Sequence, residues 1–172
     1  DGALAGGFST ADFSAARSAA IAPAVNPGLA PWSWWTQDLD SHGFNPPAWT
    51  QGATWISTNS DPLQGRSGLY AVPFEIASTE IETARFEIYY AVDDGLGALN
   101  NHSFYINEQP VPGIGGSGKL WNASRYFRDD VSSLLVTGTN WLYFDVSDRV
   151  DFSGLLYAAR IIVNGVAKAP RP

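Results

Sequence analysis

The sequence predicts an all-β protein, an antiparallel β-sandwich preceded by an irregular, partly helical N-terminal arm. From Ala53 onward apolar side chains recur with a period of two, and these runs are rich in aromatic and β-branched residues. Gly, Pro, Asn and Asp separate the runs, as turns do in sandwiches. Because no helical pattern alternates with them, a parallel α/β sheet is not expected.

Strands are expected in six segments, at residues 53–58, 68–77, 83–92, 103–111, 140–148 and 155–165. The segment 124–138 is expected to hold a short strand and then a turn or a single helical turn at residues 129–135. The predicted organisation is an arm over residues 1–52, a sandwich over 53–166 and a C-terminal tail over 167–172.

The arm begins with a predicted helix. Ser9 is a suitable N-cap with Asp12 three residues later, and Pro23 ends the run. The helix face that contains Phe13 and Arg17 is only weakly amphipathic, so the helix needs tertiary support. A strap rich in Pro, Gly and Trp follows, and its tryptophans must pack against something.

Composition excludes several classes of protein. With 45% hydrophobic and 16% charged residues, the chain is not a disordered tail. A net charge of −7 argues against nucleic acid as a partner, because phosphates are bound by basic surfaces. The sequence contains no cysteine, which excludes a disulfide framework, and no run of about 18 apolar residues, so no membrane span is expected.

Alternation within the strands predicts which side chains are buried. Three residues of the segment 83–92 share one side, Phe86, Ile88 and Tyr90, and three of the segment 140–148 do the same, Leu142, Phe144 and Val146. The opposite side of the latter segment carries Trp141, Tyr143 and Asp145. That side is expected to be either solvent-exposed or a ligand-bearing face.

Four segments occur in an order that resembles the galactose-binding-domain-like jelly-roll superfamily over about residues 53–166. They are "ARFEIYYAVDDG", "SFYINEQPV", "LWNASRYFRDDVSSLLVTGTNWLYFDVSD" and "GLLYAARIIV", with matching positions at Asp93, Asp94, Asn107, Trp121, Gly138 and Asn140. The resemblance implies a jelly roll that serves as a non-catalytic carbohydrate-binding, adhesion or accessory module, often with structural calcium. This chain departs at Asn107-Glu108, where Asn-Gly is commoner, and a different turn type is therefore predicted.

The loop after the segment 83–92 offers hard oxygen ligands for calcium from Asp93, Asp94, Asn100 and Asn101. Their spacing matches no fixed calcium pattern, and Asp and Asn are also ordinary turn formers. A plain turn, a calcium site and a ligand contact therefore all remain open. Zinc is not expected, because His42 and His102 are far apart and lack a third nitrogen or sulfur donor.

Carbohydrate binding requires aromatic faces for stacking and polar groups for the hydroxyls. The candidates are Trp121, Asn122, Arg125, Tyr126, Trp141, Tyr143 and Asp145, with a structural role for Trp121 and Trp141 as the alternative. No Gly-x-Ser-x-Gly elbow and no marked pair of carboxylates occurs, so the protein is not expected to be an enzyme.

Two functions follow from these patterns. The first is a secreted or cell-surface module that binds a glycan or a surface polymer, because the chain begins Asp1-Gly2-Ala3 as if a signal peptide had been removed. The second is a self-assembling structural subunit of a filament, sheath or coat. Its intersubunit anchors would be Phe13, Trp32, Trp34, Trp35 and Trp49. Alternatively, the arm wraps its own sandwich and covers a sheet edge.

Overall fold

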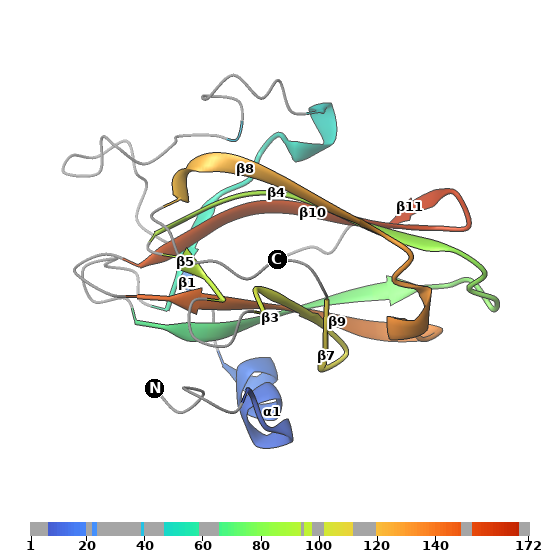
Figure 1. The fold of residues 1–172 in the computed structure, drawn as a ribbon, viewed down its shortest axis with the longest axis horizontal. Coiled ribbons are helices and arrows are strands. Elements are labelled where there is room, and N and C mark those ends of the chain that lie inside the picture. The colour runs from blue at the N-terminus through green and yellow to red at the C-terminus, as the bar shows by residue number, and fades with distance from the viewer. Residues whose placement is uncertain are drawn as a thin grey trace.

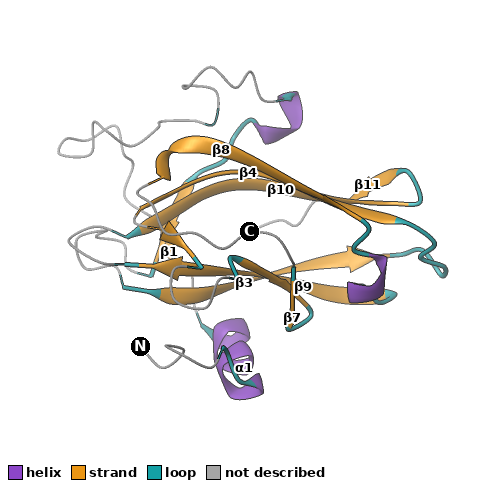
Figure 2. Ribbon diagram, in the orientation of Figure 1, coloured by secondary structure: helices purple, strands orange, loops and turns teal. Residues whose placement is uncertain are grey.

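Two antiparallel sheets are stacked, with a short helix packed on the outside (Figure 1). The computed structural model describes residues 7–19, 22–23, 39, 47–58, 66–93, 95–97, 102–111, 120–148 and 153–168, with the backbone alone at 22–23, 120–129 and 167–168. Figure 2 shows the strands in two layers and the helical turns at their margins. The predicted antiparallel β-sandwich is confirmed.

Sheet A has the strand order β1-β2-β10-β4-β8. These strands are β1 (Ala22–Pro23), β2 (Trp55–Ser57), β10 (Gly154–Val163), β4 (Ala84–Asp93) and β8 (Leu120–Asp129), and β11 (Val166–Lys168) also pairs with β10. The long central pair runs from Ala84 opposite Val163 to Asp93 opposite Gly154.

Sheet B has the order β3-β9-β6-β7, and β5 also pairs with β9. Its strands are β3 (Gly68–Ile76), β9 (Gly138–Ser147), β6 (Phe104–Ile106), β7 (Gln109–Pro110) and β5 (Gly95–Leu96). The prediction of one strand over 103–111 is wrong, because the chain folds back at Asn107-Glu108 and forms the β6–β7 hairpin. Backbone φ angles of 49° and 69° at these two residues reverse its direction.

The other expected segments each contain a strand, and two of them differ in extent. The strand expected within 124–138 begins earlier, at Leu120, and is followed by the 3-10 helix η3 (Ser132–Leu134) at the predicted helical turn. The segment 155–165 contains most of β10 and then a turn at Asn164-Gly165, where both φ angles are positive.

The core between the sheets contains all six side chains that alternation assigned to it, together with others. Phe104 lies at its centre, with ring centroids 5.6 Å from Phe86, 5.8 Å from Tyr90 and 5.7 Å from Phe144. Phe86, Phe104 and Phe144 are fully buried. Since burying one such side chain contributes about 1.5–3 kcal/mol, this cluster holds the two sheets together.

The helix α1 (Thr10–Ser18) covers part of the outer face of sheet B. Ser9 is its N-cap, and reciprocal hydrogen bonds between Ser9 and Asp12 form a capping box, which confirms the predicted start. Phe13 and Ala16 are buried against side chains of β3, β6 and β9, and these contacts supply the tertiary support that the weakly amphipathic sequence required. In the described ranges, no helix is long and apolar enough to cross a membrane.

Another part of the arm lies on the outer face of sheet A. The 3-10 helix η1 (Ala48–Thr50) carries Trp49, which packs with Leu39 against side chains of β2, β4 and β10. Leu39 is only 2% exposed. The described parts of the arm therefore contact both outer faces of their own sandwich.

Candidate functional site

The uncovered part of sheet B's outer face, next to α1, combines an aromatic ring with polar groups. Pro73 of β3 pairs with Trp141 of β9, and Glu75 pairs with Thr139 in the next position on the same face. Trp141 is partly exposed, while Pro73, Glu75 and Thr139 are exposed. The Thr139 hydroxyl donates a hydrogen bond to the Glu75 carboxylate. We name this surface the Trp141 platform and include in it Arg17, Pro73, Glu75, Glu108, Thr139 and Trp141.

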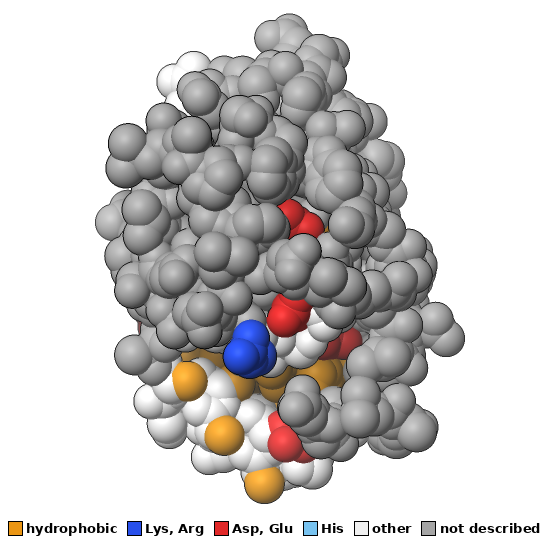
Figure 3. All heavy atoms as spheres, turned by 90° about the vertical axis from the view of Figure 1, so that its left-hand side faces the viewer, with side chains coloured by type: hydrophobic (Ala, Val, Ile, Leu, Met, Phe, Trp, Pro, Cys, Tyr) orange, Lys and Arg blue, Asp and Glu red, His pale blue; other side chains and the backbone are white. Residues whose placement is uncertain are grey.

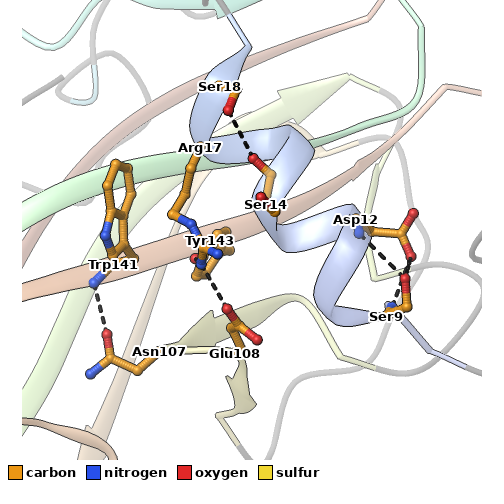
Figure 4. Close-up of polar contacts among 9 residues, drawn as sticks. All are labelled: Ser9, Asp12, Ser14, Arg17, Ser18, Asn107, Glu108, Trp141 and Tyr143. Carbon is orange, nitrogen blue, oxygen red and sulfur yellow. Dashed lines mark hydrogen bonds and ion pairs between the residues drawn. The ribbon is translucent and has the colours of Figure 1, made fainter.

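An ion pair forms the part of the platform that lies next to the helix. Arg17 Nη1 lies 2.7 Å from Glu108 Oε1 and donates a second hydrogen bond of 2.6 Å to the Tyr143 hydroxyl. Figure 4 shows the three side chains meeting below α1, with the Trp141 ring beside Arg17. The hydrogen bond from Arg17 to Glu108 raises the pKa of Arg17, and burial raises the pKa of Tyr143. The positive charge of Arg17 is therefore balanced within the protein.

Hydrogen bonds from the β6–β7 turn hold Trp141 in place. The backbone N–H of Trp141 donates to Asn107 Oδ1, and the backbone N–H of Asn107 donates to the Trp141 carbonyl, both at 2.9 Å. Asn107 Nδ2 donates to the Leu134 carbonyl at 2.9 Å and to Oδ1 of the fully buried Asn140 at 2.7 Å. The indole consequently projects from a fixed backbone position.

The turn that carries Glu108 differs from the prediction. Both Asn107 and Glu108 have positive φ, which is the combination that Asn-Gly turns adopt, so the prediction of a different turn type is wrong. A left-handed conformation costs a residue with a Cβ about 1–2 kcal/mol. The side-chain hydrogen bonds of Asn107 and the ion pair of Glu108 hold the turn in spite of this strain.

Three of the predicted carbohydrate-binding residues lie on the outer face of sheet B, and they differ in exposure. Trp141 and Asp145 are partly exposed, whereas Tyr143 has no exposed surface. Phe13 lies with its ring centroid 4.8 Å from that of Tyr143. With α1 in place, the Tyr143 ring offers no face to a ligand, and this part of the predicted solvent-exposed or ligand-bearing side is a packing surface for the helix.

The other four predicted residues, Trp121, Asn122, Arg125 and Tyr126, are in β8, at the edge of sheet A. In the strand register Arg125 is opposite Tyr89 and Tyr126 is opposite Ile88. The seven residues are thus divided between the two sheets instead of following one strand face. Trp141 is the one that belongs to the platform.

Of the four predicted calcium ligands, the structure describes only Asp93. It ends β4, where it pairs with Gly154, and is 4% exposed, while Asp94, Asn100 and Asn101 lie outside the described residues. In Figure 3, which views the molecule from the left of Figure 1, acidic side chains are visible beside a basic one. Within the described part of the chain, no three His, Cys, Asp or Glu residues are grouped as a metal site would require. Calcium stays a prediction.

A glycine of the same loop has a clear backbone role. Gly97 has a φ of 66°, and a Cβ at this position would approach the His102 carbonyl carbon and the Ser103 nitrogen to 2.7 Å. The Gly97 N–H also donates to the Asp145 carbonyl at 2.9 Å. Only glycine fits this close approach, as a tight turn requires.

The predicted intersubunit anchors that the structure describes pack within the chain. Phe13 of α1 is 3% exposed. The Trp49 ring lies 5.5 Å from the Tyr89 ring, with the Arg160 guanidinium 4.5 Å from the Trp49 ring centroid. These contacts agree with an arm that wraps its own sandwich. Trp32, Trp34 and Trp35 lie outside the described residues.

The sequence patterns did not identify Arg17, Glu75, Glu108 and Thr139 as site residues. Arg17 and Glu108 are 91 positions apart, and no local pattern indicates that the helix meets the turn. Glu75 and Thr139 become neighbours only through the pairing of β3 with β9. Alternation within one strand cannot show which residues of different elements come together.

Comparisons with protein-family models, with curated proteins and with solved structures found no match for this chain.

Proposed function

We propose that this protein is a non-catalytic carbohydrate-binding module whose ligand stacks on Trp141. The observation that supports the proposal is a partly exposed indole on a sheet face, bordered by polar groups, whose backbone is held by the Asn107 hydrogen bonds and whose ring packs on Tyr143. The apolar face of a pyranose ring packs on such an indole, and neighbouring polar atoms bind its hydroxyls. A ring that already packs on its neighbours loses less side-chain entropy on binding than a free one.

The charges around the platform favour neutral or amine-bearing sugars. Glu75 is an exposed carboxylate, and Glu108 is a second carboxylate at the border. Arg17, the basic residue of the platform, is engaged by Glu108 and Tyr143. An acidic sugar would meet Glu75 without an unengaged platform cation to offset the repulsion.

The proposal contains no reaction. The two platform carboxylates each accept a hydrogen bond from a neighbour, Glu75 from Thr139 and Glu108 from Arg17. A glycosidase needs two carboxyl groups that face each other across a cleft. The platform is an outer sheet face, which suits binding without cleavage.

The finer fold assignment and the location of the protein are part of the same proposal. We assign the sandwich to the galactose-binding-domain-like jelly rolls and place the protein outside the cell or at its surface. In support, Asn107 and Asn140, two positions of the sequence resemblance, hydrogen-bond to each other at 2.7 Å. A structural calcium ion at the Asp93 loop belongs to this proposal too, and a rise in melting temperature on adding calcium to chelator-treated protein would support it.

The test is a glycan array followed by calorimetry on three proteins, the wild type, Trp141→Ala and Trp49→Ala. Trp49→Ala is the matched control, because it removes a partly exposed tryptophan from the other outer face. We expect Trp141→Ala to weaken binding about tenfold or more, equivalent to about 1.4 kcal/mol, and Trp49→Ala to bind as the wild type does. No binding of neutral or amine-bearing glycans by the wild type would contradict the proposal, and so would equal binding by both variants.

Self-assembly remains the second candidate function, and one observation favours it. Among the described strands, β8 has ten residues without a proline and pairs only with β4.

A further inference from the structure

The edges of the two sheets differ in their proline content. Among the described strands, six have a single described neighbour: β1, β8 and β11 in sheet A, and β3, β5 and β7 in sheet B. Three of these edge strands contain a proline, at Pro23, Pro73 and Pro110. Proline lacks an N–H and hinders the addition of another strand. Of the three without a proline, β5 and β11 have only two and three residues, whereas β8 has ten, and its neighbour among the described strands is β4.

The regular part of β8 is limited by an irregularity at one end. Leu120 pairs with Val92 and Ser124 pairs with Tyr90, so that four steps along β8 oppose two steps along β4. From Ser124 opposite Tyr90 to Asp129 opposite Arg85 the register is unbroken. A bulge disrupts the ladder locally, and the straight edge therefore extends from residue 124 to 129.

The sequence of this straight segment, "SRYFRD", complements itself in the antiparallel direction. Pairing two copies about Phe127 places Arg125 opposite Asp129 of the second copy, and the two-fold axis produces this pair twice. Opposite charges on directly paired positions contribute about 0.2–1 kcal/mol per pair. Moving the axis to the point between positions 126 and 127 would instead place Arg125 opposite Arg128, which is unfavourable.

We propose that β8 is the interface through which two copies of this chain join, antiparallel about a two-fold axis at Phe127, so that sheet A continues across both copies. The backbone groups on the side of β8 away from β4 pair with those of the other copy. The complementary charges favour a second copy over an unrelated peptide. The inference does not depend on carbohydrate binding, because the Trp141 platform is on the other sheet.

The first test is sedimentation velocity of the full chain with charge-reversal variants. Arg125→Asp and Asp129→Arg each create like-charged pairs twice in the dimer, and we expect each to raise the dimer Kd about tenfold or more. The double variant restores both pairs with reversed sign and should return the Kd to within a few-fold of the wild type. Glu80→Arg is the control, because it reverses the charge of an exposed residue outside β8, as Asp129→Arg does within it. It should leave the dimer unchanged.

The second test does not require the ion pairs. Because the chain contains no cysteine, Phe127→Cys introduces a single thiol at the proposed axis. Directly paired antiparallel residues have Cα atoms about 4.5–5.5 Å apart, within the range that a disulfide bridges. We expect rapid oxidative cross-linking of Phe127→Cys and slow cross-linking of Val136→Cys, which replaces a residue that is 54% exposed.

Three results would overturn the inference. They are a wild type that sediments as a monomer at every concentration, a dimer that is indifferent to the charge reversals, and cross-linking of Phe127→Cys that is no faster than that of Val136→Cys. Circular dichroism of each variant identifies any that fails to fold, and the thiol test then decides.

Discussion

The two outer faces of the sandwich are alike in composition and differ in how each uses its tryptophan. Each face has an arginine–glutamate pair beside a tryptophan and a covering element from the N-terminal arm. On sheet A the tryptophan is Trp49, which belongs to the arm, and Arg160 lies 4.5 Å above its ring. On sheet B the covering element is α1, and the tryptophan is Trp141 of the sheet itself, which remains partly exposed beside the helix.

The ion pairs of the two faces differ in the burial of the glutamate, whereas the two arginine side chains are almost equally exposed, at 27% and 28%. Arg160 Nη2 lies 2.7 Å from Glu87 Oε2, and the Glu87 side chain is 11% exposed. Arg17 and Glu108 are equally close at 2.7 Å, but each side chain is 28% exposed. The pair on sheet A therefore lies packed under Trp49, whereas the pair on sheet B is part of a surface that a ligand can reach.

The largest expected effect is a loss of stability, and it differs between the two residues of the arm that cover the sheets, Phe13 and Trp49. Phe13→Ala should lower the free energy of unfolding by about 3 kcal/mol, because Phe13 is 3% exposed and contacts the rings of Phe8, Tyr105 and Tyr143. Trp49→Ala should cost less, about 2 kcal/mol, since Trp49 is partly exposed. Denaturant unfolding of both variants measures the difference, and a larger loss for Trp49→Ala would reverse the order of the two faces.

The next effect compares the two ion pairs. Glu87→Gln should destabilise the protein by about 1.5–3 kcal/mol, because it removes a charged acceptor that binds Arg160 through two hydrogen bonds. Glu108→Gln should cost about 0.5 kcal/mol, as expected for a more exposed pair. Double-mutant cycles with Arg160→Met and Arg17→Met isolate the coupling energies. Equal coupling in both pairs would contradict the proposed difference in burial.

A third prediction concerns the strained turn beside the platform. Glu108 has a φ of 69°, so Glu108→Gly should be more stable than Glu108→Ala by about 1 kcal/mol, although both variants lose the ion pair. Gln109, which is in β7 and has no positive φ, provides the control, because there alanine should be the more stable replacement. Thermal melting of the four variants would show no such contrast if the turn were unstrained.

The smallest effect concerns acid and the cap of α1. Hydrogen bonds from the Ser9 hydroxyl and backbone N–H lower the pKa of Asp12 below its ordinary value of 3.8. A lowered folded-state pKa gives stability that is present above the unfolded-state pKa and is lost as pH falls through the folded-state value. Below about pH 4, amide exchange in α1 should therefore quicken before exchange near Trp49 does. Asp12→Asn should reduce this dependence on pH, and an unchanged profile would contradict the role of the cap.

The sequence identified the elements of this fold better than it identified what covers them. Alternation placed Phe86 and Phe144 in the core, and the Ser9–Asp12 spacing located the start of α1, because these signals are local. The same alternation put Tyr143 on an outer face but could not reveal that Phe13, from a distant segment, buries it. The type of the β6–β7 turn was predicted wrongly because Glu108 stands where glycine usually provides a positive φ.

The candidate site was predictable only in part for the same reason. Trp141 could be selected from its aromatic character and its position in a strand. Its polar neighbours come from α1, β3 and the β6–β7 turn, and these elements meet through tertiary contacts. Strand pairing and helix docking are set by the whole core, and local spacing does not encode them.

The most direct test of the account is whether α1 covers sheet B of its own chain. In a mixture of isotope-labelled and unlabelled protein, filtered nuclear Overhauser spectra separate contacts within a chain from contacts between chains. With ring centroids 4.8 Å apart, Phe13 and Tyr143 should give strong signals within the labelled chain and none between labelled and unlabelled chains. Signals between chains would show that the helix covers a neighbouring molecule and would contradict the account.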